Sequence, residues 1–283
     1  MLGFPRRQHP ASGEKRNGGG RRLADLIGLG GLVVVTIVAL FPHTFMPFDA
    51  QLRVGPSLSP PSTTYFFGTD DIGRDLYSRV ILGIRFTWLP AIAIIALASV
   101  FGSVIGMIAG LVGGWIDELL QRIIDVFFIV PSMLFAMAFS AILGPGTDHS
   151  VIAVAICWWP WYAWIARDEL VRIKGSPHFQ GALVAGTSRP RQISRYGLPG
   201  VFPSLITAAG VDVANVVTTL SLMSFLGLGQ PDPAPELGAL VSRSLDSLTM
   251  FWWLPILPAT VIFLICFLAN LFGDAVRTKM RGR

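Results

Sequence analysis

The sequence has little charge and little cysteine. Only 14% of its 283 residues are charged and 52% are hydrophobic, which is too apolar for an ordinary soluble domain of this length. The two cysteines, Cys157 and Cys266, both lie in apolar runs, which argues against a disulfide framework and against a metal site. This composition predicts a membrane protein.

Catalytic signatures are also missing. The sequence contains no G-x-x-x-x-G-K-[ST] phosphate loop, so the chain is not expected to hydrolyse ATP by that chemistry. It contains neither G-x-S-x-G nor H-E-x-x-H. With no nucleophile and base in a recognisable pattern, a membrane enzyme is disfavoured, and we expect no catalytic residue, no metal and no cofactor. The basic residues flank apolar runs and build no single basic face, so nucleic-acid binding is not expected either.

Apolar runs of membrane-crossing length occur about six times, which predicts an all-α polytopic membrane protein. The first run is long for a signal peptide and lacks a small-residue cleavage site, so we interpret it as an uncleaved anchor. The fourth is short and contains Pro160. The expected spans are 26–46, 86–111, 123–143, 151–166, 201–226 and 252–272.

The distribution of lysine and arginine predicts the orientation. With six spans, 17 of these residues lie on the side that holds both termini and 5 lie on the other side, so both termini are expected in the cytoplasm. The expected organisation is a basic cytoplasmic tail over residues 1–25, a first transmembrane helix over 26–46, an external segment over 47–85, a transmembrane core over 86–273 with a cytoplasmic loop at 167–200, and a basic cytoplasmic tail over 274–283.

A short helix is predicted inside this cytoplasmic loop. Ser176 can cap its start, Pro177 suits a first helical position, and Gly186 is a natural stop. Gly181 and Ala182 leave little side-chain bulk, so another protein could approach closely. The segment is therefore a candidate docking helix for a separate motor protein.

The segment resembles the EAA loop of the permease subunits of bacterial ABC importers, with Gln180 in place of the family's glutamate and Gly181 in place of its first alanine. The run Gly68-Thr-Asp-Asp-Ile-Gly-Arg-Asp-Leu-Tyr-Ser-Arg79 closely resembles the GTDxxGRDxxSR signature of the dipeptide, oligopeptide and nickel importer permeases, and it indicates the C-type partner of the permease pair. The resemblance extends from about Phe67 to the C-terminus.

The resemblance implies a complex. Its other members would be a second permease subunit, two ATP-binding subunits and an extracytoplasmic substrate-binding protein, within the lipid of a bacterial inner membrane. The family's mechanism is alternating access, in which a cytoplasmic coupling helix moves with the ATP-binding subunits. The implied substrate is a small polar solute such as a di- or oligopeptide.

Three polar residues form a stripe on the fifth expected span. Asp212, Asn215 and Thr219 are spaced i, i+3 and i+7, and a carboxylate inside a bilayer is costly unless it faces the bundle interior or a watery path. The stripe therefore either lines a substrate route or holds neighbouring helices together by hydrogen bonds. Asp212 is the only carboxylate deep in an expected span, which disfavours a self-contained secondary transporter or channel.

Two further patterns are interpreted as structural. Gly102, Gly106 and Gly110 recur on one face of the second expected span, which favours close helix packing. In the external segment, Asp70 with Arg74 and Asp75 with Arg79 are spaced to pair along a helix lying on the outer membrane surface. The acidic residues near Asp117 are expected to form salt bridges at a helix end.

Overall fold

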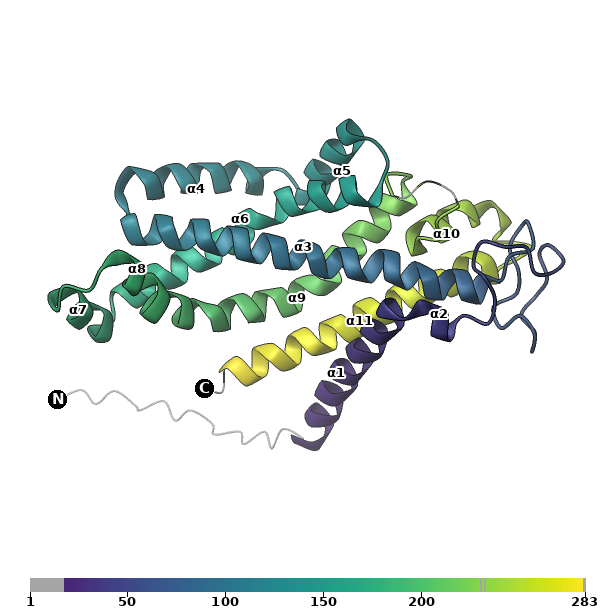
Figure 1. The fold of residues 1–283 in the computed structure, drawn as a ribbon, viewed down its shortest axis with the longest axis horizontal. Coiled ribbons are helices and arrows are strands. Elements are labelled where there is room, and N and C mark those ends of the chain that lie inside the picture. The colour runs from purple at the N-terminus through teal and green to yellow at the C-terminus, as the bar shows by residue number, and fades with distance from the viewer. Residues whose placement is uncertain (1–17, 230, 232, 282–283) are drawn as a thin grey trace, which may run out of the picture.

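A computed structural model describes residues 18–229, 231 and 233–281, and over these residues the chain is helical with no strand. The predicted all-α fold is confirmed. Residues 1–17 and 282–283 of the expected tails lie outside the described part. The elements, shown in Figure 1, are α1 (Gly18–Leu40), α2 (Pro42–Phe45), α3 (Leu76–Val112), α4 (Gly114–Ile129), α5 (Ser132–Leu143), α6 (Thr147–Lys174), α7 (Pro177–Val184), α8 (Arg189–Gln192), the π-helical turn η1 (Ile193–Gly197), α9 (Leu198–Phe225), α10 (Leu237–Arg243), the 3-10 turn η2 (Leu245–Ser247) and α11 (Trp253–Arg281).

The expected number of about six spans is not confirmed. Four segments of the described chain are long and apolar enough to cross a membrane, and the α4–α5 pair raises the number to five. The fourth expected span lies within α6, which has 28 residues but is rich in tryptophan and charged toward its end. The four segments are Leu23–Leu40, Leu76–Val112, Arg189–Phe225 and Trp253–Met280.

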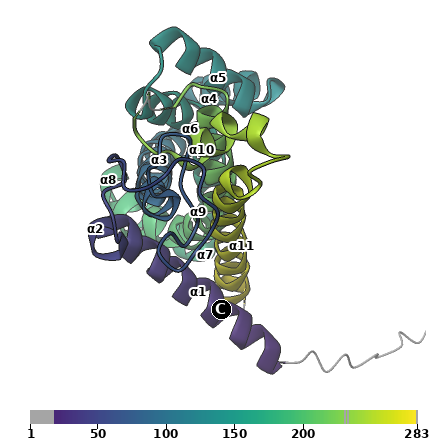
Figure 2. The ribbon, with the colours of Figure 1, turned by 90° about the vertical axis from the view of Figure 1, so that its right-hand side faces the viewer.

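The third expected span is not one straight helix. It is broken between α4 and α5, which meet at an angle of 88°. Pro131 has no backbone N–H to donate, and the residue before a proline is driven to extended backbone, as Val130 is with φ −100° and ψ 134°. Helix α4 therefore runs alongside α3, and α5 turns away from it beside α6 (Figures 1 and 2).

The helix that contains the second expected span begins ten residues before it, at Leu76. The expected surface helix over the 68–79 run is instead a turn followed by the first turn of α3. Asp75 is the N-cap of α3, and its Oδ2 atom accepts hydrogen bonds from the backbone N and the Oγ of Ser78 at 2.8 and 2.7 Å. This cap fixes the helix start inside the run that carried the family resemblance.

The helices α3 and α6 pack together along most of their lengths at the centre of the bundle. A Cβ atom added at Gly102 would collide with the carbonyl of Trp159, and one at Gly106 with the carbonyl of Ala163. At Gly110 the nearest atom, the carbonyl oxygen of Arg167, is 3.2 Å from an added Cβ, so the approach is looser there. Small residues thus let the two backbones touch, as in other membrane helix pairs.

The two ends of the bundle differ. One end, here called the α7 end, carries α7 and α8 together with the C-terminal ends of α3 and α6. The other, the α10 end, carries α2, residues 46–75 and α10, which Figure 2 views from the front. Helix α1 runs antiparallel to α11, since Gly28 lies against Phe272 and Gly31 against Leu268. The start of α1 therefore lies beside the end of α11.

Candidate functional site

Two cavities meet at Asp212 on α9. The first has a volume of about 600 Å³ and the second about 410 Å³, and Asp212 and Trp161 line both. The first is also lined by Trp164, Glu169, Arg172, Gly200, Thr207 and Arg277, among others, and the second by Phe127, Phe128, Pro131, Cys157, Trp158 and Asn215, among others. Asp212 therefore stands where the two cavities adjoin.

The carboxylate of Asp212 is buried and incompletely satisfied. The side chain is 7% exposed, and its Oδ1 atom accepts one long hydrogen bond, of 3.4 Å, from Nδ2 of Asn215. Its Oδ2 atom has no hydrogen-bond partner among the described residues, although the phenol of Tyr162 on α6 interacts with the carboxylate electrostatically. Leaving a buried charged oxygen without a donor is costly.

The expected polar stripe is split by the structure. Asp212 and Asn215 line the second cavity, whereas Thr219 is buried, donates its hydroxyl to the carbonyl of Asn215 at 2.8 Å and lines neither cavity. Trp161 was not singled out from the sequence. Its place beside Asp212 depends on how α6 packs against α9, which a local pattern does not encode.

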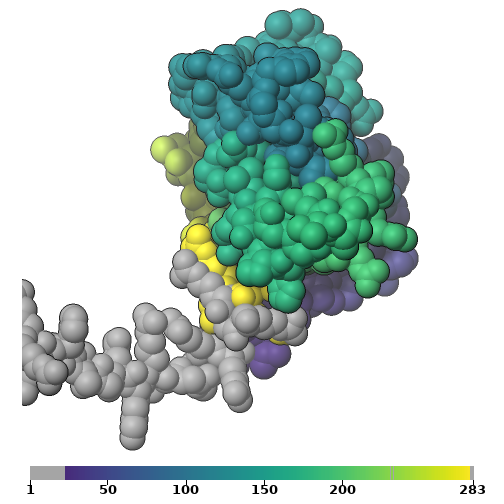
Figure 3. All heavy atoms as spheres, turned by 90° about the vertical axis from the view of Figure 1, so that its left-hand side faces the viewer, coloured from purple at the N-terminus to yellow at the C-terminus, as the bar shows by residue number. Residues whose placement is uncertain are grey.

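The predicted loop helix exists as α7 and has the predicted cap. The Oγ of Ser176 accepts a hydrogen bond from the backbone N of Phe179 at 3.4 Å, Pro177 is the first helical residue, and Gly186 ends the segment with φ +72°. Figure 3 shows α7 and α8, in green, at the surface of the α7 end.

The inner and outer faces of α7 have different roles. Phe179 and Ala182 are buried against the chain itself, and the Phe179 ring makes an edge contact with Tyr196 at 6.1 Å between centroids. Gly181 lies on the outside, where an added Cβ would meet no atom of the described chain within 4 Å. Val184 is 91% exposed and Leu183 41% exposed. The outer face is therefore Gly181, Leu183 and Val184, and Ala182 lies on the anchored face.

Two side chains connect α7 to α6 and α3. Nε2 of Gln180 donates to the carbonyl of Lys174 at 2.7 Å, at the end of α6. Nζ of Lys174 donates in turn to the carbonyls of Gly110 and Leu111 at 2.9 and 3.2 Å, at the end of α3. These three bonds satisfy carbonyls that a helix end leaves unpaired. A glutamate at position 180 carries no proton to donate when ionised, so glutamine suits this geometry.

An ion pair joins α4 to α6 at the same end. Nε and Nη2 of Arg167 donate to the two carboxylate oxygens of Asp117 at 2.9 and 2.6 Å. This arginine fork holds the carboxylate in two parallel bonds. The expected local pairing is present too, between Glu118 and Arg122 at 3.7 Å, but both side chains are exposed and such a pair contributes little.

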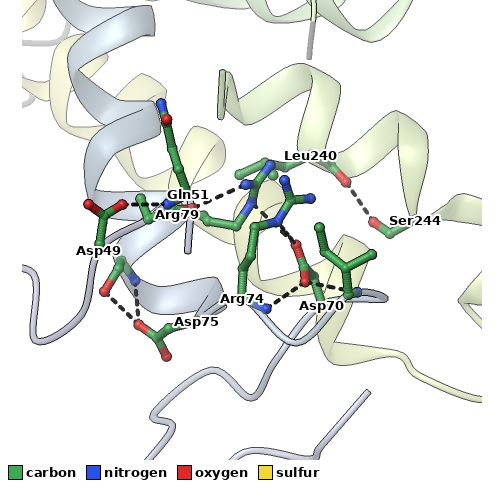
Figure 4. A network of polar contacts seen from close by, with 11 residues as sticks. Asp49, Gln51, Asp70, Arg74, Asp75, Arg79, Leu240 and Ser244 are labelled. Atoms are coloured by element: carbon green, nitrogen blue, oxygen red, sulfur yellow. Dashed lines mark hydrogen bonds and ion pairs between the residues drawn. The ribbon is translucent and has the colours of Figure 1, made fainter. Parts of the chain in front are cut away.

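At the α10 end, Asp70 organises the run that precedes α3. Its Oδ1 atom accepts hydrogen bonds from the backbone N of Ile72 and of Arg74, and its Oδ2 atom accepts one from Nε of Arg74 at 2.6 Å. Figure 4 shows the Arg74 and Arg79 side chains directed at this carboxylate. Arg79 is almost fully buried and also donates to the carbonyl of Ala50 at 3.1 Å. The expected Asp70–Arg74 pair is thus formed, within a turn.

No group of three or more histidine, cysteine or acidic residues in the described part of the chain could hold a metal ion.

Comparison with known proteins gives one family. Residues 102–282 match the family model described as "Binding-protein-dependent transport system inner membrane component". The "Probable D,D-dipeptide transport system permease protein DdpC" of Escherichia coli (strain K12) is 32% identical over 249 residues, which cover 86% of this chain and 84% of that protein. The "Glutathione transport system permease protein GsiD" of Escherichia coli O6:K15:H31 is 32% identical over 256 residues, which cover 88% of this chain and 83% of that protein. A solved structure of the MetNI methionine ABC transporter in inward-facing conformations is 20% identical, covers 69% of this chain and 96% of its own, and has a TM-score of 0.48.

Proposed function

The chain belongs to the family of binding-protein-dependent transport system inner membrane components, as a peptide-type permease subunit of an ABC importer, and on this premise we propose which of its residues form the substrate route and which contact the motor. It is a multi-pass protein of the inner membrane. Small solutes move through such subunits, and the relatives are named for dipeptide and glutathione transport.

Asp212 and Asn215 line the route of the solute. The observation that carries this assignment is the place of Asp212 between two cavities, buried and with one oxygen lacking a hydrogen bond among the described residues. Ionisable residues inside a membrane mark pathways by default. The alternative role, holding helices together, has only the Tyr162 interaction from α6 in its favour, since the Asn215 bond joins two residues of the same helix. Thr219, which bonds only its own helix, belongs to the packing of α9.

The segment Ser176–Gly186 couples the permease to an ATP-binding subunit. Its outer face of Gly181, Leu183 and Val184 is small and apolar, and a motor protein could cover it. Its inner face, Phe179 and Ala182, anchors the helix to this chain. The charge distribution supports a cytoplasmic position for this loop and for both termini.

The complete importer then contains a second permease subunit, two ATP-binding subunits and an extracytoplasmic substrate-binding protein. ATP is hydrolysed by the partner subunits, since this sequence has no phosphate loop. Binding and hydrolysis displace α7, and alternating access releases a small polar solute, such as a di- or oligopeptide, into the cytoplasm.

The route assignment is tested with Asp212→Ala. Uptake of a labelled peptide should fall while the variant still assembles with its partner subunits, as measured by co-purification. Asp125→Ala, which removes an exposed carboxylate of α4, is the matched control and should leave uptake unchanged. Normal uptake by Asp212→Ala would refute the route, and loss of assembly before loss of uptake would make Asp212 structural.

A further inference from the structure

The second cavity has an unusual lining. Of the side chains named above, Phe127, Phe128, Trp158 and Trp161 are aromatic, and Asp212 is the only charged group that lines the cavity among the described residues. An aromatic wall with one carboxylate is the chemistry that binds an organic cation, since the ring faces attract positive charge and the carboxylate supplies the counter-ion.

The carboxylate of Asp212 can bind such a ligand. Its Oδ2 atom is buried and has no hydrogen bond of ordinary geometry from the described chain, although the phenol of Tyr162 interacts with the carboxylate, so a donor arriving from the cavity could still bind it. Among the residues that the structure describes, no lysine or arginine lines this cavity, whereas the first cavity has Arg172 and Arg277. A cation in the second cavity therefore meets no like charge.

We infer that Asp212 and the aromatic wall of the second cavity recognise an ammonium group of the transported solute. This inference rests on the proposed route, because it assumes that the solute passes Asp212. It adds a charge preference to that route: a solute carrying a free ammonium group is held here, and an anion without one is not.

The chain carries its own reporter for this test. The thiol of Cys157 lines the same cavity. Cys266 lines neither this cavity nor the first, and it contacts Thr218 at 3.4 Å, so it serves as an internal control. The assembled transporter is treated with a trimethylammonium-bearing or a sulfonate-bearing methanethiosulfonate. Modification of each cysteine is then followed by mass spectrometry.

The expected result is a cation-to-anion rate ratio at Cys157 that exceeds the ratio at Cys266 by about tenfold, because a weakly screened carboxylate lining the same cavity has an effect of this order. The isosteric variant Asp212→Asn should bring the two ratios together, and Asp125→Asn should not. Alaninamide, a cation, should slow modification of Cys157, and N-acetylalanine, an anion, should not.

Two results would overturn the inference: equal ratios at the two cysteines in the unmodified chain, or a Cys157 ratio that survives Asp212→Asn. Cys157 is only 6% exposed, so if neither reagent modifies it, a cysteine at Ser132 in the same cavity takes its place as reporter and the same two results apply. If Asp212→Asn fails to assemble, Trp161→Leu provides the test. It should weaken the protection by alaninamide, and Trp161→Phe should retain it; equal protection in both would count against the aromatic wall.

Uptake measured on the same variants separates the proposed solute route from the recognition of an ammonium group. If Asp212→Asn loses uptake and the unmodified chain shows no charge preference, the route stands and ammonium recognition fails. If uptake by Asp212→Asn is normal, both fail.

Discussion

The anchoring of α7 gives a prediction that can be worked out from the structure. Phe179 is 1% exposed and packs edge-on against Tyr196, so Phe179→Ala removes a fully buried ring. Such truncations cost about 3–5 kcal/mol in a packed core. Since α7 has 8 residues and isolated helices shorter than about 12–15 residues are marginal in water, α7 depends on such contacts to stay helical and docked. Even a loss of about 3 kcal/mol shifts the equilibrium between docked and undocked α7 by about a hundredfold.

The matched variant is Val184→Asp on the outer face of the same helix. Val184 is 91% exposed, so its replacement removes almost no contact within the chain. A carboxylate there would be desolvated under an ATP-binding subunit, which is costly without a partner. The two variants therefore separate the anchoring of α7 from its contact with the motor.

Limited trypsin digestion and co-purification of the ATP-binding subunit measure the two effects. Phe179→Ala should speed cleavage after Arg191, which is exposed shortly after α7, and should weaken retention of the ATP-binding subunit. Val184→Asp should leave cleavage unchanged and weaken retention alone. An unchanged cleavage pattern in Phe179→Ala would refute the anchoring argument. Full retention and normal uptake by Val184→Asp would refute the assignment of the outer face.

Three further outcomes are expected. Gly106→Ala should reduce thermal stability by about 1–3 kcal/mol or prevent assembly, because the new methyl group meets the carbonyl of Ala163; an unchanged melting temperature would contradict the close packing of α3 and α6. Gly181→Ala should favour the helical state of α7 by about 0.8–1 kcal/mol, since its Cβ would meet nothing within the described chain, and slower trypsin cleavage after Arg191 is the readout. A cysteine at Ser188 should react with thiol reagents only from the cytoplasmic side, and labelling of intact cells by an impermeant reagent would reverse the orientation.

The sequence predicted the features that depend on local chemistry. The cap at Ser176, the stop at Gly186 and the small-residue face of α3 follow from preferences that act within one helix or between any two close helices. The break at Pro131 follows from equally local rules. The sequence pattern nevertheless predicts one continuous span here, because the apolar run continues on both sides of the proline.

Features that depend on packing were not predicted. Whether Ala182 faces outward or inward depends on how α7 lies against Tyr196, and its small size alone suggested the outer face. The Asp117–Arg167 pair joins residues 50 positions apart, so no sequence periodicity reveals it. The apolar runs predict where the long helices lie, but they do not predict how many of these helices cross the membrane. The reason is that α6 is long and rich in tryptophan without being strongly apolar.

The hydrogen bonds of Gln180 and Lys174 have a mechanical consequence. They join α7 to α6 and α6 to α3 in sequence, and the contacts at Gly102 and Gly106 keep the last two helices together. Helix α3 has 37 residues, so it extends for about 55 Å from this junction to Asp75 at the opposite end. A force applied to α7 is thus delivered across the whole thickness of the molecule by a single helix, with Pro90 as its one internal proline, and it arrives beside the Asp70 turn. The two ends of the molecule can therefore move together without any signal passing through the cavities.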